Sequence, residues 1–185
     1  SQGARVMSDV VPAALAKLPD GLRARLHVVQ QARPEDIDRV RAQYQSAGID
    51  ADLESFFDDM PARIAASHLV IGRSGASTVA ELSVIGRPSV LVPLPHSLDN
   101  DQKANAGKLQ DAGAGIMIEQ KNFTAETFAT TLTELLGDAS RLSSMAVAAL
   151  GQGVPDAVGR LADLVEQLGR GEAASGPLHI TQEDR

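Results

Sequence analysis

One stretch decides the fold of this chain: GRSGASTVAEL, residues Gly72–Leu82. It follows the apolar run His68–Ile71, which indicates a buried strand, and it opens a helical pattern that ends at Gly86. A strand that turns into a helix through small residues leaves backbone N–H groups unpaired at the positive end of the helix dipole. Such groups form a binding site for phosphate. Glu81 lies one turn into this helix, from where a carboxylate can reach the hydroxyls of an attached sugar. The stretch therefore predicts a nucleotide-type ligand.

Strand and helix patterns alternate outward from this stretch in both directions. The expected strands are Leu26–Gln30, Asp52–Phe57, Leu69–Ile71, Ser89–Pro93 and Gly115–Glu119; the expected helices are Arg5–Leu18, Pro34–Ala47, Pro61–Ala66, Ser77–Ile85, Gln102–Ala112, Thr124–Leu136, Ala139–Leu150 and Val154–Leu168. Strands separated by helices of this length form right-handed crossovers. We therefore predict an α/β fold, a Rossmann-like parallel sheet with helices on both faces, which binds ligands beyond the carboxyl ends of its strands.

The N-terminus begins with a turn and a helix instead of a strand. Ser1–Arg5 has the pattern of the end of a glycine-containing turn, whereas helices of α/β domains normally follow a strand. We therefore expect the chain to be cut from a longer protein and its sheet to lack the first strand. We assign residues 1–168 to one ligand-binding domain, and residues 169–185, which are rich in Gly, Glu, Ser, Pro and Asp, to a disordered tail.

The amino-acid composition argues against some classes of binding partner. The 185 residues are 43% hydrophobic and 22% charged, as in a globular protein, with a formal net charge of −7 and only 3% aromatic residues. These values argue against nucleic acid or anionic lipid as a partner of the whole surface. Cysteine is absent, which agrees with a reducing compartment, and the four histidines have no metal-ligand spacing. No run approaches the roughly 20 apolar residues of a membrane span. We expect no nucleic acid partner, no cofactor and no metal.

Each candidate element of the site also has a purely structural interpretation. Thr78–Glu81 fits the Ser/Thr-x-x-Glu capping box, in which Glu81 only caps its own helix. The polar loop at 93–101 leads into the next helix, where Asp99 or Asn100 can serve as the N-cap. Alternatively, Gln102 and its neighbours hydrogen-bond sugar hydroxyls, because amide and carboxylate groups donate and accept such bonds.

A second exit from a strand lies at Phe56–Met60. Backbone groups there can read the edge of a planar base, or Asp59 can simply cap a helix that has Pro61 at its first position. His96 lies in a loop with no second group to orient it, and we do not assign it to catalysis.

Three elements in this order resemble one family of enzymes: SQGAR at Ser1–Arg5, RSGASTVAE at Arg73–Glu81, and PLP followed by DQKANA within Pro93–Ala106. The chain resembles the C-terminal half of the MurG family of peptidoglycan N-acetylglucosaminyltransferases, which have a GT-B fold. The likeness spans roughly Ser1 to Leu168 and includes Phe57–Met60.

The resemblance implies which residues bind each part of the sugar donor UDP-GlcNAc. It places Ser1 and Gln2 by the diphosphate, and the Phe57 backbone against uracil with Met60 nearby. It implies that Glu81 binds the ribose hydroxyls and that phosphate and sugar are bound by Gly75, Ala76, Ser77 and Thr78. The GlcNAc would be bound by Asp101, Gln102 and Asn105.

The same resemblance implies a hexosyltransferase that adds GlcNAc to lipid I by inversion, giving lipid II in peptidoglycan synthesis. The lipid I acceptor and the catalytic base belong to the N-terminal half of such enzymes, so we expect this chain alone to bind UDP-GlcNAc weakly and to catalyse nothing. The implied location is cytoplasmic, with the full-length protein peripheral on the cytoplasmic face of the membrane and no membrane contact expected from this half. Two alternatives stay open: another GT-B sugar-nucleotide enzyme, such as a UDP-GlcNAc epimerase, and a non-catalytic α/β interaction domain.

Overall fold

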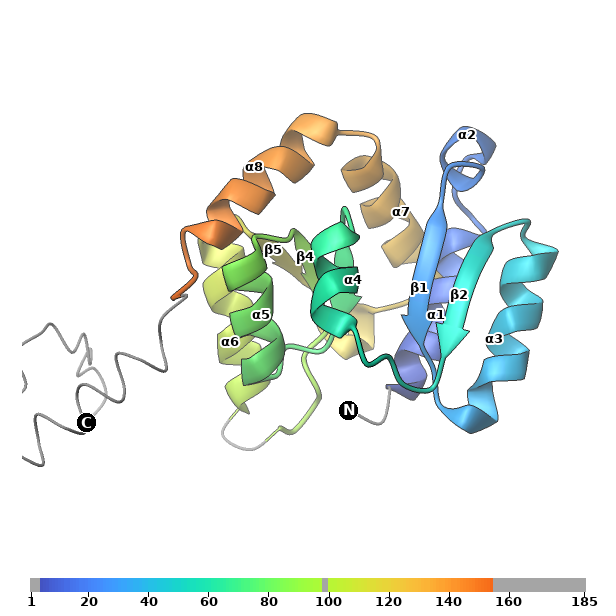
Figure 1. Cartoon of the computed structure of the whole chain (residues 1–185), viewed down its shortest axis with the longest axis horizontal. Helices are drawn as coiled ribbons and strands as arrows, with labels where there is room; N and C mark the ends of the chain where they lie inside the picture. The colour runs from blue at the N-terminus through green and yellow to red at the C-terminus, as the bar shows by residue number, and fades with distance from the viewer. Residues whose placement is uncertain (1–3, 98–99, 155–185) are drawn as a thin grey trace, which may run out of the picture. The chain divides into compact units, whose positions relative to one another are not determined.

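Helices and strands alternate along the chain in the computed structural model, which describes residues 4–97 and 100–154 (Figure 1). The elements are α1 (Arg5–Leu15), α2 (Asp20–Arg23), β1 (His27–Gln31), α3 (Pro34–Ser46), β2 (Asp50–Glu54), α4 (Met60–Ala66), β3 (Val70–Gly72), α5 (Ala76–Ile85), β4 (Ser89–Leu91), α6 (Asp101–Asp111), β5 (Gly115–Met117), a 3-10 turn (Gln120–Asn122), α7 (Ala125–Leu136) and α8 (Ala139–Leu150). The predicted alternation of strand and helix is confirmed. Apart from Val154, the helix expected at 154–168 and the tail expected at 169–185 lie outside the described residues, as do Ser1 and Gln2.

The helix expected over Arg5–Leu18 is interrupted. It ends at Leu15, and the short helix α2 begins at Asp20. The cause is Pro19, because the residue before a proline is disfavoured in the helical conformation and Pro19 itself is extended, with ψ of 142°.

The strand expected over Asp52–Phe57 is shifted towards the N-terminus. Strand β2 covers Asp50–Glu54, and its last residue is paired with Gln31, the last residue of the parallel strand β1. Because the partner strand ends there, residues 55–59 form a turn between β2 and α4.

The strands form two parallel sheets within the described residues, where we predicted one. The first sheet is β1-β2, and the second has the order β3-β4-β5. No described strand pairs with the other edge of β1 or of β3. The effect on burial is clear: all residues of β4, which has a strand on each side, are buried, whereas all residues of β3 are half-buried.

Helices cover both faces of the β3-β4-β5 sheet. Val90 and Val92 point into a core cluster that also contains residues of α1, α3 and α7, whereas Leu91 between them points into a second cluster with residues of α4, α5 and α6. All three side chains are fully buried, as the alternation of side chains along a strand requires. Residues of β1 and β2 contribute to the first cluster, so both sheets pack against the same helices.

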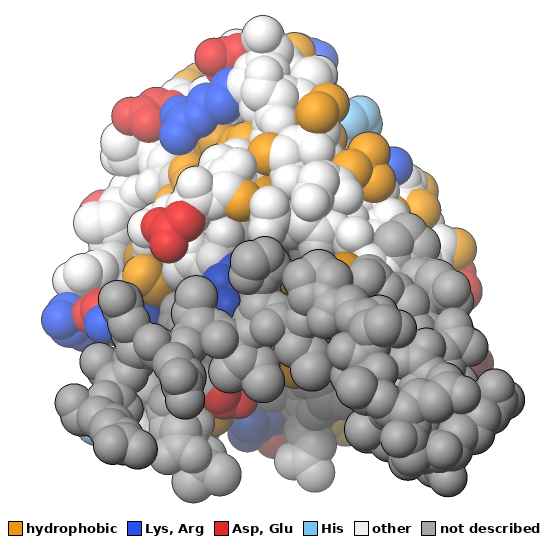
Figure 2. Space-filling model, turned by 90° about the vertical axis from the view of Figure 1, so that its left-hand side faces the viewer, with side chains coloured by type: hydrophobic (Ala, Val, Ile, Leu, Met, Phe, Trp, Pro, Cys, Tyr) orange, Lys and Arg blue, Asp and Glu red, His pale blue; other side chains and the backbone are white. Residues whose placement is uncertain are grey.

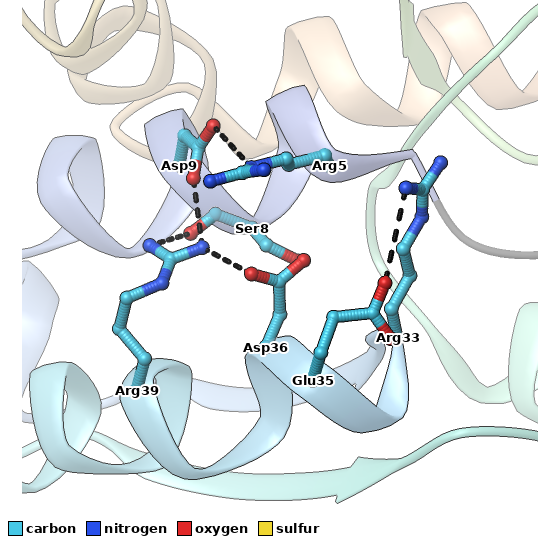
Figure 3. Close-up of polar contacts among 7 residues, drawn as sticks. All are labelled: Arg5, Ser8, Asp9, Arg33, Glu35, Asp36 and Arg39. Atoms are coloured by element: carbon cyan, nitrogen blue, oxygen red, sulfur yellow. Dashed lines mark hydrogen bonds and ion pairs between the residues drawn. The ribbon is translucent and has the colours of Figure 1, made fainter.

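Arg39 joins α1 to α3 (Figure 3). Its Nη2 donates to Oδ1 of Asp9 and Oδ1 of Asp36, both at 2.7 Å, and its Nη1 donates to the carbonyl oxygen of Ser8 at 3.4 Å. The hydrogen bond with Asp36 is the main reason why the pKa of Arg39 is raised. Within the described residues, all hydrogen bonds of this guanidinium therefore go to α1 and α3.

Hydrophobic side chains are exposed on the side of the molecule that α6 and α8 occupy in Figure 1, and Figure 2 shows hydrophobic side chains on that side, scattered among backbone and other side chains. In α8, 70% of Val147 and 54% of Leu150 remain exposed. Across residues 4–97 and 100–154, no helix combines the length and the apolar character that a bilayer crossing requires.

Candidate functional site

Helix α5 begins with open backbone groups. Gly75 is its N-cap residue, in the extended conformation, and no side chain caps the helix. Its first turn contains no acidic residue, and Ala76 and Ser77 are exposed. The N–H groups of this turn are therefore available to an anion, at the positive end of the dipole.

The capping-box interpretation of Glu81 is wrong. Thr78 lies inside α5 and not at its N-cap position, so Glu81 is too far along the helix to complete a capping box with it. The Glu81 side chain is half-buried and makes no hydrogen bond or ion pair with any described residue. An unpaired carboxylate thus lies one turn further along the helix than the open N–H groups.

Arg73 holds together the carboxyl ends of the strands that carry this turn. It directly follows β3, and its Nη1 donates to the carbonyl oxygens of Val92 and Pro93, each at 3.0 Å, after β4. Its Nη2 donates to Oε1 of Gln120 at 2.6 Å, after β5. Burial lowers the pKa of Arg73. Sequence reasoning did not single out this residue, because its partners come from two separate segments, one after β4 and one after β5.

Hydrogen bonds join the start of α6 to the loop between β3 and α5. Ser74 is fully buried, and its hydroxyl donates to the carbonyl oxygen of Gln102 at 2.7 Å, while Nδ2 of Asn105 donates to the carbonyl oxygen of Ser74 at 3.2 Å. Oε1 of Gln102 accepts from the backbone N–H of Leu94 at 3.0 Å. Nε2 of Gln102 and Oδ1 of Asn105 have no partner among the described residues and remain available to a ligand.

Asp101 lies beside this pair and is exposed. Its Oδ1 accepts from the backbone N–H of Gln102 at 2.7 Å. Asn100 occupies the N-cap position of α6 in the left-handed conformation, with φ of 54°, and its side chain makes no capping hydrogen bond. Asp99, the other residue that we considered as a cap, lies outside the described residues.

The turn after β2 presents backbone groups at the same edge. Phe57 is buried, with 6% of its surface exposed, whereas Phe56 is 65% exposed. Met60 is the first residue of α4 and is half-buried. Asp59 occupies the N-cap position of α4, but its carboxylate accepts from Arg63 instead of capping the helix. That hydrogen bond is the main reason why the pKa of Asp59 is lowered.

The predicted site residues from Phe57 to Asn105 therefore follow the carboxyl ends of parallel strands. In Figure 1 the strands β1 and β2 point towards the lower edge, where α5 and α6 begin. Direct hydrogen bonds connect the Arg73–Gly75 loop with Gln102 and Asn105. No hydrogen bond between described residues links this group to Phe57 or Met60, which lie in the turn after β2 and at the start of α4.

A compact ion cluster lies after β5. Glu119 accepts from Nζ of Lys103 at 2.8 Å and from Nζ of Lys121 at 2.7 Å, and the two ammonium groups lower its pKa to about 2. Lys103 follows Gln102 in α6, so this cluster adjoins the candidate site. In the part of the chain that the structure describes, no group of three or more His, Asp or Glu side chains could hold a metal ion.

The parallel sheets, the uncapped helix and the polar start of α6 define one half of a GT-B glycosyltransferase fold. The chain matches the family model "Glycosyltransferase family 28 C-terminal domain" over residues 1–161, and it belongs to that family. This match confirms the resemblance inferred from the sequence.

Two curated relatives carry the same enzyme name. The chain is 61% identical over 166 residues to "UDP-N-acetylglucosamine--N-acetylmuramyl-(pentapeptide) pyrophosphoryl-undecaprenol N-acetylglucosamine transferase" of Methylobacterium nodulans, a match that covers 89% of this chain and 44% of that protein. It is 59% identical to the protein of the same name in Rhodopseudomonas palustris strain BisB18, over 91% of this chain and 45% of that one. The chain thus spans less than half the length of these relatives.

Solved structures agree with the fold. The crystal structure of Acinetobacter baumannii MurG superposes with a TM-score of 0.82 at 30% identity, covering 89% of this chain and 49% of that one. The glycosyltransferase WaaG of lipopolysaccharide biosynthesis superposes with a TM-score of 0.64 at 21% identity, covering 86% of this chain and 42% of that one, and supports the fold alone.

Proposed function

We propose that this chain is the UDP-GlcNAc-binding half of an inverting glycosyltransferase that adds GlcNAc to lipid I and so forms lipid II. One observation carries the proposal: α5 starts without a side-chain cap, and the carboxylate of Glu81 behind it has no described partner. The enzyme name shared by the two relatives supports the same donor and acceptor.

In this proposal each part of the donor meets a matching group. The diphosphate lies against the N–H groups of residues 75–78, Glu81 accepts hydrogen bonds from the ribose hydroxyls, and Asp101, Gln102 and Asn105 surround the GlcNAc. Phe57 and Met60 lie by the uracil ring. Ser1 and Gln2 belong by the diphosphate in the proposal, although they lie outside the described residues.

The proposed reaction develops negative charge on the leaving diphosphate. A hydroxyl of lipid I attacks the anomeric carbon, its proton goes to a base in the other half of the enzyme, and the bond to UDP breaks with its electron pair on the diphosphate. The leaving diphosphate gains negative charge in the transition state. Helix α5 already points its N–H groups at that position, so it stabilises the change without reorganising.

The full-length protein is proposed to be cytoplasmic and peripheral on the inner face of the membrane, with lipid I bound through the other half. The chain alone is proposed to bind the donor and to be inactive, because the acceptor site and the base are supplied elsewhere.

Titration of the chain with UDP and UDP-GlcNAc, by calorimetry or NMR, tests the proposal. We expect Glu81→Ala to raise the Kd for UDP roughly tenfold or more, because hydrogen bonds to a charged group contribute about 1.5–3 kcal/mol. The matched control is Glu134→Ala on α7, which removes an exposed carboxylate away from the strand ends and should leave the Kd unchanged. If the wild-type chain gives no UDP-dependent signal up to millimolar ligand, the interaction-domain alternative is favoured instead.

A further inference from the structure

The side chain of Arg63 in α4 makes three contacts with strand β2 and with the turn that follows it. Its Nε donates to Oδ1 of Asp59 at 2.6 Å, and its Nη1 donates to Oδ2 of Asp52 at 2.5 Å. Its Cζ lies 4.0 Å from the centroid of the Phe57 ring. A single guanidinium therefore connects a strand, the turn that follows it and the N-cap residue of the next helix.

The turn Ser55–Asp59, here called the base-reading turn, has few other constraints. Its residues Phe56–Asp58 donate no backbone–backbone hydrogen bond within the described part of the chain. One further contact comes from Gln31, whose Nε2 donates to the carbonyl oxygen of Ser55 at 2.9 Å. The conformation of the turn thus depends on side-chain contacts at both ends and on the ring in the middle.

Burial distinguishes the ring of Phe57 from the side chains around it. Phe57 is 6% exposed, whereas its neighbours Phe56 and Asp58 are exposed. A planar guanidinium over an aromatic face combines apolar contact with cation–π attraction, so the ring is fixed beneath Arg63. Because its side chain serves as an anchor, Phe57 can offer a ligand only its backbone groups.

Fixed backbone groups can distinguish pyrimidine bases. Uracil and cytosine have the same shape, but uracil has a carbonyl oxygen where cytosine has an amino group. A backbone N–H held opposite that position donates to uracil and is opposed by the amino hydrogens of cytosine. The discrimination is lost when the N–H can move away, so it requires a rigid turn.

We propose that Arg63 is a positioning residue that fixes the base-reading turn and thereby makes the site select uracil over cytosine. This inference rests on the proposed function, since it requires that the turn meets the base of a nucleoside diphosphate. Arg63 acts through Asp52, Asp59 and Phe57 and does not itself contact the ligand.

The test compares the Kd values of UDP and CDP for the wild-type chain and for variants, by calorimetry or ligand-observed NMR. We expect the wild-type chain to prefer UDP. Arg63→Ala should reduce the ratio of the CDP Kd to the UDP Kd by about fivefold or more, mainly through weaker UDP binding. Asp52→Asn, which keeps the side-chain volume, should reduce the ratio in the same direction by a smaller factor.

A conservative variant and a matched control separate positioning from general stability. Arg63→Lys keeps the charge but loses the planar fork and the stacking. Its ratio of the CDP Kd to the UDP Kd should therefore lie between those of Arg63→Ala and the wild-type chain. Arg39→Ala removes the same arrangement, a guanidinium between two carboxylates, from the contact between α1 and α3 (Figure 3). This control should lower the melting temperature and leave the UDP preference unchanged.

The outcomes are distinct. A folded Arg63→Ala chain with the wild-type ratio overturns the inference, and so does an equal loss of ratio in Arg39→Ala. If Arg63→Ala does not fold, the Asp52→Asn ratio decides in the same way. A wild-type chain that binds neither nucleotide overturns the proposed function, and the inference with it.

Discussion

The guanidinium of Arg73 donates a hydrogen bond to Oε1 of Gln120 at 2.6 Å, and so connects the residue after β3 with the turn after β5. Strand β4 lies between these two strands, and the same guanidinium donates to the carbonyl oxygens of Val92 and Pro93 that follow β4. One side chain thus fixes the edge of the sheet at which the candidate site is built.

Replacing Arg73 by Met should destabilise the chain and weaken donor binding together. The variant leaves the carbonyl oxygens of Val92 and Pro93 without their donor, which we expect to lower the free energy of unfolding by about 1–3 kcal/mol. Urea denaturation and a UDP-GlcNAc titration measure the two effects. Arg25→Met is the control, because Arg25 is exposed and its side chain has no partner among the described residues. Equal effects of the two variants would contradict the role given to Arg73.

A negative charge at the start of α5 should have opposite effects on stability and binding. Ser77→Asp places a carboxylate in a first turn that has none, which should stabilise the helix by about 0.3–1 kcal/mol. The same carboxylate repels a diphosphate, so the Kd for UDP should rise. Thermal unfolding and UDP titration provide the two readouts.

The control for that experiment is Ser140→Asp in the first turn of α8, which should stabilise its own helix without changing the Kd for UDP. If both variants leave UDP binding unchanged, the phosphate does not lie at α5.

The carboxyl group of Glu119 should remain ionised in acid. Hydrogen bonds from Lys103 and Lys121 lower its pKa to about 2 from the ordinary 4.5. A carboxyl whose pKa is depressed by folding contributes stability above its unfolded pKa, and this contribution is lost as the pH falls from about 4.5 towards 2. The carboxyl carbon chemical shift of Glu119 should therefore show no protonation at a pH of about 3.5.

Removing the ammonium groups should reverse this shift. In a double variant, Lys103→Met with Lys121→Met, the titration of Glu119 should move up towards its ordinary range. Lys108 is an exposed residue of the same helix α6 whose side chain has no described partner, so Lys108→Met should leave the titration as it was. A normal titration in the wild-type chain would show that the ion pairs do not form in solution.

Ser89 and Gly115 face each other across β4 and β5, and substitutions there should be coupled. The hydroxyl of Ser89 is buried without a hydrogen-bond partner among the described residues, so Ser89→Ala should be neutral or stabilising by about 1 kcal/mol. A Cβ at Gly115 would lie 2.8 Å from Oγ of Ser89 and 3.3 Å from its carbonyl oxygen, so Gly115→Ala should cost about 1–3 kcal/mol. In the double variant the cost should be smaller, because one of the two close contacts is gone. Chemical denaturation of the four proteins measures the coupling, and additive effects would contradict it.

The local part of the site could be predicted from the sequence. Small residues after an apolar run placed the turn at Gly75, and the positive φ of 75° at Gly86 confirms the predicted end of α5. Thr124, at which the helix 124–136 was expected to begin, is the N-cap residue of α7 and accepts from the N–H of Thr127. The hydroxyl of Thr127 completes a capping box in place of the usual Glu, which the pattern Ser/Thr-x-x-Glu could not indicate.

Sequence patterns of this kind could not predict the long-range side-chain contacts. The partners of Arg73 follow β4 and β5, and those of Arg63 come from β2 and from the turn after it, so they are known only when the strands are assembled. The separation into two sheets was missed for a similar reason, since periodicity identifies strands but not their neighbours.

The two separate sheets have a consequence for how water reaches the backbone. Val70 donates to the carbonyl oxygen of Pro88, and the carbonyl oxygen of Gly72 accepts from Val92, so both residues face β4. By the alternation of a parallel strand, the peptide groups of Ile71 face the opposite side, where no described strand pairs with β3. Deuterium should therefore replace the amide proton of Ile71 well before that of Val90, so solvent reaches one side of the strand that precedes the proposed phosphate-binding turn.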